Sequence, residues 1–199
     1  MADAEVPVRA AEEPHEPKPV EPVVIEERRK LRVRDLITLL KDPNLNYRWH
    51  AAELLGEERD AEAVGPLIEA LKDPFVDVQW LAAKSLGQIG DTRALVPLLD
   101  ATTSNDKWLR AGAAWGLGKL KDPRAVERLL ILLKDKKTRV RKEAAWALGS
   151  IADNRAVPGL TEALTDPDES VRDAARKALA SIQGAPVEKI EGISGKPIQ

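Results

Sequence analysis

The sequence contains no cysteine, and this absence excludes several classes of site at once. Disulfide bonds, thiolate zinc sites, iron–sulfur clusters and cysteine nucleophiles all require that residue. Histidine is nearly absent too, because the 199 residues include only His15 and His50. Two imidazoles leave little for a multi-histidine metal centre. We therefore expect no metal site and no bound cofactor.

The chain also lacks a dominant charge and a long apolar run. It carries 31 basic and 33 acidic residues, for a formal net charge of −2, whereas nucleic-acid binding usually starts from a strongly basic domain. No stretch approaches the roughly 18 apolar residues of a membrane span, and the start of the chain does not resemble a secretory signal. We therefore expect a soluble, cytoplasmic protein with no membrane partner and no nucleic-acid partner.

What the sequence does contain is a period of 31 residues between Lys30 and Gly184. Leucine recurs at position 26 of every unit, alanine at position 22, and glycine at position 27 of the first four. The five units are 30–60, 61–91, 92–122, 123–153 and 154–184. A fixed period of this length is the signature of a stacked repeat architecture.

Two segments flank the predicted repeats. Residues 1–29 are acidic and rich in proline, which is typical of a disordered arm, although residues 26–29 could begin the first helix. Residues 185–199 contain glycine and proline breaks and are predicted to be a free C-terminal tail.

Each unit is predicted to hold two helices. Apolar residues at unit positions 4, 7, 8 and 11 follow one face of a first helix, and those at 18, 22, 25, 26 and 29 follow a second. A residue at position 13 is expected to cap the second helix, and the aspartate at position 31 a turn before the first. The position-13 residues are Asp42, Asp73, Ser104, Asp135 and Asp166, and the last is spaced from Glu169 as in a capping box.

An arginine recurs at position 19, where it could suggest phosphate binding. These arginines are Arg48, Arg110, Arg141 and Arg172. Their recurrence together with aspartates at positions 13 and 31 predicts instead a ladder of ion pairs between units.

The string V-R-x-x-A-A-x-A-L-G-x-I is present at residues 140–151 and nearly so at 171–182, and D-x-R-A-V stands before the first helix at residues 122–126 and 153–157. This pattern closely resembles HEAT-like repeats of the phycobilisome-lyase type over residues 30–184. The resemblance implies an all-α fold, a right-handed α-solenoid of five helical-hairpin repeats whose second helices line a concave, partner-binding surface. It says less about function, because that repeat is a scaffold found in binding proteins, bilin lyases and a hydroxylase.

Five of the seven aromatic residues are tryptophan, and all lie on the second helices, away from the predicted core. Such a row either fills gaps between helices or forms a binding face. Since leucine, valine, isoleucine and alanine already fill the core positions, the second alternative is favoured. We predict that a protein or peptide binds these tryptophans and the polar residues beside them in a concave groove. The predicted contacts are Trp49, His50, Glu53, Trp80, Lys84, Trp108, Trp115, Lys119, Arg139, Lys142 and Trp146.

Along the same helix face, acidic side chains gather in the first unit and basic ones in units two to four, so charge could orient a ligand. The main alternative is a bilin lyase or chaperone-like subunit of the phycobilisome-lyase type, because the tryptophans could hold a small planar ligand such as a flat tetrapyrrole.

Enzymatic alternatives are disfavoured. Deoxyhypusine hydroxylase, which has HEAT-like repeats, uses several His-Glu pairs on such helices, but the matching positions here hold no such pair. His50 and Glu53 share a helix face, yet His50 has no second ligand near it. No Ser/His/Asp set or phosphate-binding glycine loop is present either. We therefore predict a non-enzymatic protein- or peptide-binding scaffold with no catalytic residue.

Overall fold

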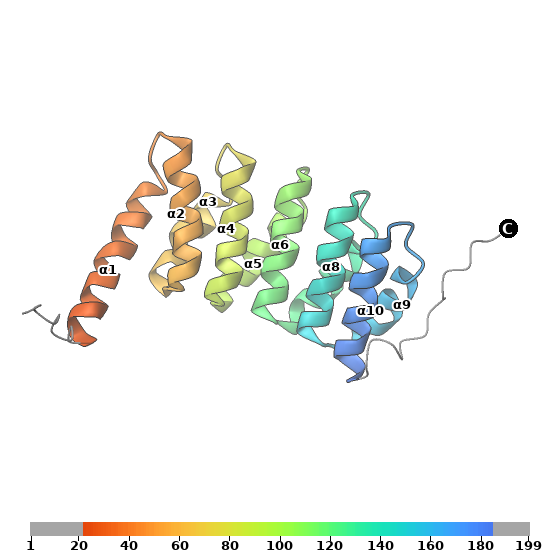
Figure 1. Cartoon of the computed structure of the whole chain (residues 1–199). Coiled ribbons are helices and arrows are strands. Elements are labelled where there is room, and N and C mark those ends of the chain that lie inside the picture. The colour runs from red at the N-terminus through yellow and green to blue at the C-terminus, as the bar shows by residue number, and fades with distance from the viewer. Residues whose placement is uncertain (1–21, 185–199) are drawn as a thin grey trace, which may run out of the picture.

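The computed structural model describes residues 22–184, and over that range the chain forms ten α-helices and no strand. Figure 1 shows the even-numbered helices side by side in front and the seven-residue odd-numbered helices behind them, while the 18-residue helix α1 (Pro22–Leu39) lies at the end of the row. This arrangement is the predicted all-α solenoid. Within the described range, no helix is long and apolar enough to cross a bilayer.

The helices alternate between the two layers. The front layer consists of α2 (Leu45–Glu58), α4 (Val76–Ile89), α6 (Lys107–Leu120), α8 (Thr138–Ile151) and α10 (Glu169–Gln183). The rear layer consists of α1 (Pro22–Leu39), α3 (Val64–Ala70), α5 (Leu95–Ala101), α7 (Val126–Leu132) and α9 (Val157–Ala163). Helix α1 begins inside the stretch predicted as a disordered arm, so residues 22–29 are helical; residues 1–21 and the predicted tail lie outside the described range.

The core lies between the two layers, at the positions that the period predicts. The leucines at unit positions 7 and 26 are the largest side chains in this core. The fully buried ones are Leu55, Leu67, Leu86, Leu98, Leu117, Leu129, Leu148 and Leu160. Burying one such side chain contributes roughly 1.5–3 kcal/mol, so the repeated leucines account for much of the packing between layers.

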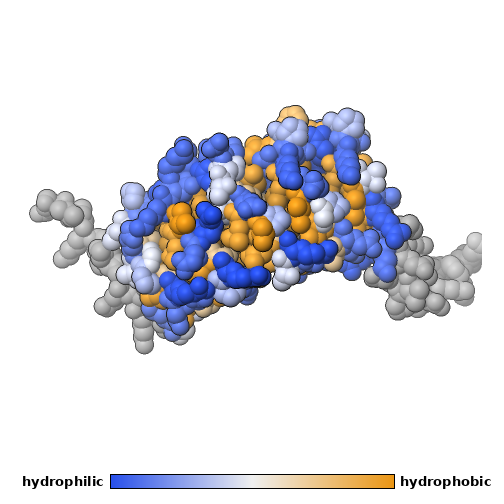
Figure 2. All heavy atoms as spheres, turned by 180° about the vertical axis from the view of Figure 1, so that it is seen from behind, coloured by the Kyte–Doolittle hydropathy of each residue, from blue (hydrophilic) through white to orange (hydrophobic). Residues whose placement is uncertain are grey.

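The even-numbered helices approach one another closely because small residues lie between them. A Cβ atom added at Gly87 would lie 2.5 Å from the Cα of Gly116, and one at Gly149 would lie 2.6 Å from the Cα of Ala178. The odd-numbered helices pack on their even-numbered partners and hardly on one another. The even-numbered layer is thus the more tightly spaced one, and we call its solvent-facing surface the inner face. Figure 2 shows the molecule from behind, where hydrophobic patches are interspersed with hydrophilic side chains.

The predicted caps of the even-numbered helices are wrong by two residues. Asp73 Oδ1 accepts a hydrogen bond from the backbone N–H of Phe75, and Ser104 Oγ accepts one from Asp106, at 2.9 and 3.1 Å. Position 13 therefore closes a turn before the helix. The actual N-caps lie at position 15 and are Asn44, Phe75, Asp106, Lys137 and Asp168.

The last unit shows the same displacement, so the predicted capping box is wrong. Asp168 is the N-cap of α10 and accepts from the backbone N–H of Ser170, while Glu169 is the first helical residue. The aspartates at position 31 do cap, as predicted, the 3-10 turns that precede the odd-numbered helices. They are Asp60, Asp91, Asp122 and Asp153.

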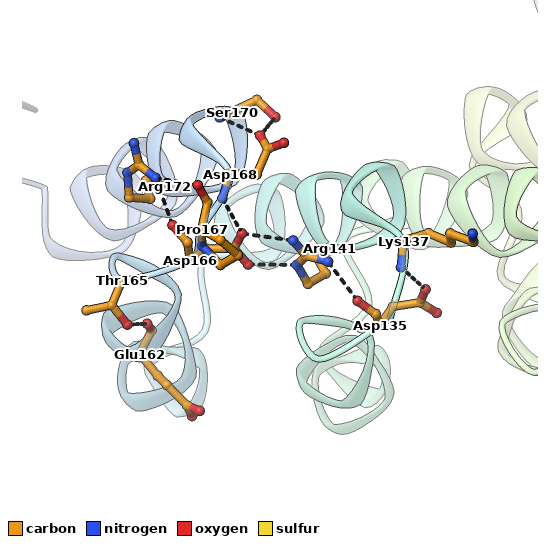
Figure 3. A network of polar contacts seen from close by, with 10 residues as sticks. All are labelled: Asp135, Lys137, Arg141, Glu162, Thr165, Asp166, Pro167, Asp168, Ser170 and Arg172. Carbon is orange, nitrogen blue, oxygen red and sulfur yellow. Dashed lines mark hydrogen bonds and ion pairs between the residues drawn. The ribbon is translucent and has the colours of Figure 1, made fainter.

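The predicted arginine ladder is present and uses position 13 of the following unit. Arg110 Nε lies 2.7 Å from Asp135 Oδ2, and Arg141 Nε lies 2.7 Å from Asp166 Oδ2 (Figure 3 shows the second pair). Arg48 pairs with Asp73 in the same way. All six side chains are largely buried. Arg172, on the last described helix, instead donates to two backbone carbonyls of its own unit.

The aspartates at position 31 are not part of the ladder, contrary to the prediction. Each of the last three instead pairs with an arginine two residues later in its own turn. These pairs are Asp91–Arg93, Asp122–Arg124 and Asp153–Arg155.

The ladder is interrupted between the second and third units, and both partners are missing there. Position 19 of the second unit is Gln79, and position 13 of the third is Ser104. Gln79 Nε2 donates instead to the backbone carbonyl of Asp73, at 2.6 Å. The paired absence leaves no unmatched charge at this junction, which is consistent with a buried ion pair being costly to leave half-formed.

We expect the double substitution Gln79→Arg and Ser104→Asp to complete the ladder. The double variant should gain about 1 kcal/mol of unfolding free energy over the sum of its two single variants, because only the pair places both charges together. Urea unfolding of the wild type and the three variants gives this coupling energy. Single-variant effects that simply add, to within about 0.5 kcal/mol, would contradict the expectation.

Candidate functional site

Four of the five tryptophans lie together on the inner face, on α4, α6 and α8. The rings of Trp115 and Trp146 are stacked, with centroids 5.7 Å apart and planes inclined by 10°. Trp80 and Trp108 line a common hollow of about 280 Å³ with Asp77 and Arg139. Equivalent positions of successive even-numbered helices are roughly 10 Å apart, which is close enough for long side chains to touch.

Basic side chains join these rings into one surface. Lys84 Nζ lies 4.6 Å from the ring centroid of Trp80 and 5.3 Å from that of Trp115. Lys119 Nζ lies over Trp115 and Trp146, at 5.1 and 5.8 Å. These distances are within the range of cation–π attraction.

Arg139 joins the fourth tryptophan to this surface. Its guanidinium lies 4.7 Å from the ring centroid of Trp108, and Arg139 also lines a small hollow with Trp80 and Lys84. We call the set of joined residues the tryptophan cluster. Its members are Trp80, Lys84, Trp108, Trp115, Lys119, Arg139 and Trp146.

The tryptophans are neither core residues nor fully exposed ones. Trp80 and Trp146 pack against the core with part of their surface, while Trp108 is 39 % exposed. Two glycines make room for the indoles: a Cβ at Gly112 would lie 2.8 Å from Trp80, and one at Gly118 would lie 2.8 Å from Trp146. Each ring is thus held in place by its neighbours and still presents part of its surface to solvent.

A hollow of about 610 Å³ lies beside the stacked pair and reaches α10. Trp115, Trp146 and Lys142 form one wall. The opposite wall comes from α10, where the residues are mostly small, and this is why the surface is recessed there. The α10 residues are Ser170, Asp173, Ala174, Lys177, Ala178 and Ser181.

Glu143 lies between the hollows and is not among the predicted contacts. It lines both the 610 Å³ hollow and a smaller one of about 120 Å³ beside Trp80 and Lys84. Burial raises the pKa of the Glu143 carboxyl, and the Arg139 and Lys142 charges limit the rise. Three further residues that line hollows were not among the predicted contacts: Asp77, Asp173 and Lys177. All four occupy unit positions 17, 20, 21 or 24, so the period itself was the available signal.

Trp49, His50 and Glu53 lie apart from the tryptophan cluster, on α2. The rings of Trp49 and His50 are 5.3 Å apart, and His50 Nδ1 lies 3.5 Å from Glu53 Oε2 on an exposed surface. No ring contact or ion pair joins these three to the cluster within residues 22–184. The same range contains no group of three or more metal-binding side chains.

Comparison with known proteins identifies the repeat. Residues 33–114 and 95–180 each match the family model of HEAT repeats. A comparison with curated protein sequences finds no significant match.

Several solved structures are similar. The complex of CpcE and CpcF of phycocyanin lyase from Nostoc sp. PCC7120 aligns at a TM-score of 0.71 and 26% identity, covering 90% of this chain and 72% of that one. YibA of Escherichia coli aligns at 0.62 and 26%, covering 92% and 67%. A designed armadillo repeat protein in complex with the peptide (KR)4 aligns at 0.60 and 22%, covering 80% and 85%, and shows the fold alone.

Proposed function

Since this chain belongs to the HEAT repeat family, we propose that it is a non-enzymatic scaffold that binds a peptide or protein segment on its inner face. The observation that carries the proposal is the stacked pair Trp115–Trp146, which is flanked by Lys119 and is open to solvent at a hollow of about 610 Å³. The tryptophan cluster would supply the main contacts. Further contacts on either side of the cluster would come from the other predicted residues, which are Trp49, His50 and Glu53 on α2 and Lys142 on α8.

The way in which the indoles are held supports this proposal. Tryptophan contributes strongly to interfaces because it presents a large flat surface and loses little conformational entropy on binding. Here Gly112 and Gly118 leave the space in which Trp80 and Trp146 are held. A pre-organised ring costs less free energy to immobilise when a partner arrives.

We expect the double variant Trp115→Leu with Trp146→Leu to lose peptide binding at least 100-fold. Leucine keeps an apolar side chain in each space but removes the flat ring, and two hot-spot residues at about 2 kcal/mol each give that loss. The probe is a set of peptides selected from a random display library on the full chain and then measured by calorimetry.

The matched control is Tyr47→Ala, because Tyr47 is an aromatic residue, 53% exposed, outside the tryptophan cluster. Its peptide affinity should equal that of the wild type. Circular dichroism separates loss of binding from loss of fold. Selected peptides that bind the folded double variant as tightly as the wild type would refute the proposal.

A second candidate, a lyase subunit that holds a bilin, is supported by the similarity to the phycocyanin lyase complex. A flat tetrapyrrole would lie against the stacked pair, and its binding would quench tryptophan fluorescence. Titration with a linear tetrapyrrole distinguishes the candidates. Quenching that disappears in the Trp115→Leu, Trp146→Leu variant would favour the lyase subunit, and no quenching would favour the scaffold.

A further inference from the structure

We propose that the segment bound by the tryptophan cluster is acidic: an extended stretch of a partner protein with a carboxylate about every third residue and apolar side chains between them. This inference rests on the proposed function, because it specifies the ligand of the same surface.

The first argument is a set of basic side chains without ionic partners. On the inner face of α4 to α10, five basic residues make no ion pair with any residue that the structure describes. They are Lys84, Lys119, Arg139, Lys142 and Lys177. By contrast, the ladder arginines of α6 and α8, Arg110 and Arg141, are paired with aspartates.

The acidic residues on the same face do not balance this charge. This face of α4 to α10 carries three acidic residues and five basic ones; the acidic residues are Asp77, Glu143 and Asp173. Asp173 is engaged by Arg176, and burial raises the pKa of Glu143. The surface from α4 to α10 is therefore positive, although the chain as a whole is nearly neutral. Charge complementarity favours an anionic partner.

The positions of the basic groups fit a ligand that is both charged and apolar. Lys84 and Lys119 hold their ammonium groups against indole rings, so a carboxylate that pairs with the ammonium brings its neighbouring side chains onto the same rings. Arg139 lies over Trp108 and can receive a carboxylate through two parallel hydrogen bonds. Lys84 is half-buried, and a partly desolvated cation attracts an anion more strongly than one in open water.

The spacing of the helices sets the spacing of the ligand's charges. Neighbouring even-numbered helices are about 10 Å apart, and an extended chain advances about 3.3 Å per residue. A peptide that crosses the inner face thus meets a new helix every three residues, and it needs about nine residues to run from α4 to α10. On α2 the same face carries Glu53 and Glu57 and no lysine or arginine, so an acidic ligand is expected to stop at α4.

A nucleic acid is also anionic, but it fits less well. Residues 30–184 have almost equal numbers of basic and acidic residues, and Glu143 lies in the middle of the surface. Strong binding to a strand depends on neutralising many phosphates, and this surface offers only five basic groups spread over four helices.

The test compares peptides selected from a random display library on the full-length wild type and on the variant Lys119→Glu with Lys142→Glu. Both lysines are exposed, so the fold should be preserved. We expect peptides from the wild type to carry an excess of Asp and Glu about three residues apart. Their affinity should fall at least 10-fold in the charge-reversed variant, and it should weaken with added salt. The control Lys72→Glu with Lys136→Glu changes the net charge equally on exposed sites outside the inner face.

Each outcome decides the question. Peptides that require Trp115 and Trp146 but show no acidic excess would overturn this inference and leave the proposed function standing. Peptides that bind independently of both tryptophans would overturn both. If a single-stranded oligothymidylate of 20 nucleotides binds more tightly than any selected peptide, the ligand of this surface is a nucleic acid and the inference is overturned. If a synthetic peptide of residues 1–21 binds more tightly than any selected peptide, the acidic segment belongs to this chain and not to a partner.

Discussion

Substitution of Gly87 by alanine is expected to lower the free energy of unfolding by about 3 kcal/mol, at the upper end of overpacking effects. The new methyl group would lie 2.5 Å from the Cα and 2.8 Å from the carbonyl oxygen of Gly116. Both are backbone atoms of α6, so no side-chain rotation relieves the contact, and α4 must move away from α6. Urea unfolding followed by circular dichroism measures the loss.

The chain provides a matched control in Gly65, in the rear helix α3. A Cβ at Gly65 would meet nothing within 4 Å, so its replacement by alanine should raise stability by up to about 1 kcal/mol through helix propensity alone. If Gly87→Ala lowers the free energy of unfolding and Gly65→Ala raises it, then glycine is required at position 87 by the close approach of α4 to α6 and not by backbone freedom. Equal effects at the two sites would contradict the packing described here.

The same contact connects stability to the proposed binding surface. Lys84 on α4 bridges Trp80 of its own helix and Trp115 of α6. A variant that moves α4 away from α6 would lengthen the second of these distances and divide the tryptophan cluster. Folded Gly87→Ala protein should therefore bind selected peptides more weakly than Gly65→Ala protein.

The fold could be predicted because each structural requirement is repeated. Leucine at position 26 is buried in every unit, so one periodic pattern identifies the helix, its core face and its neighbours. The cap positions could not be predicted, because an aspartate that closes a turn and one that caps a helix have the same side chain and lie two residues apart. Asp166 and Asp168 show both roles in one unit.

The candidate site was only partly predictable, for a different reason. The period places Trp80, Trp115 and Lys84 on one face, but it does not say which side chains meet. That depends on side-chain length and on small residues of the next helix, such as Gly112 beside Trp80. Glu143 lies on the same face, and only the packing around it shows that it is partly buried between two hollows.

The second large effect is expected at the ladder. Substitution of Arg110 by glutamine should lower the free energy of unfolding by about 3 kcal/mol, because it leaves the largely buried carboxylate of Asp135 without its ionic partner. Arg110 also donates to the carbonyls of Ser104 and Asn105, so one substitution removes contacts on both sides of a junction. Arg124→Gln is the matched control: its side chain is 68% exposed, and its ion pair lies within its own turn, so the effect should stay within about 1 kcal/mol.

The chain itself suggests how the loss can be reduced. Gln79 and Ser104 show that a junction without charges is tolerated, so the double variant Arg110→Gln with Asp135→Ser should be more stable than Arg110→Gln alone. In that double variant no carboxylate is left buried without a cation. A double variant less stable than the single one would show that Asp135 acts mainly through its hydrogen bond to the backbone N–H of Lys137.

The pH dependence of Arg110→Gln provides an independent test of the same ion pair. Burial is the largest influence and by itself would raise the pKa of Asp135, but the hydrogen bonds from Arg110 and from the backbone N–H of Lys137, together with the Arg110 and Lys136 charges, hold that pKa below its usual value. A lowered folded-state pKa contributes stability that is present above the unfolded value, about 3.9, and is lost as the pH falls through the folded value. The unfolded state contributes equally to both proteins, so the stability difference between wild type and Arg110→Gln should be largest near neutral pH, where Asp135 is ionised in both, and should shrink as the pH falls and Asp135 becomes protonated. A difference that stays constant down to pH 2 would mean that Arg110 stabilises the fold through its carbonyl contacts and not through Asp135.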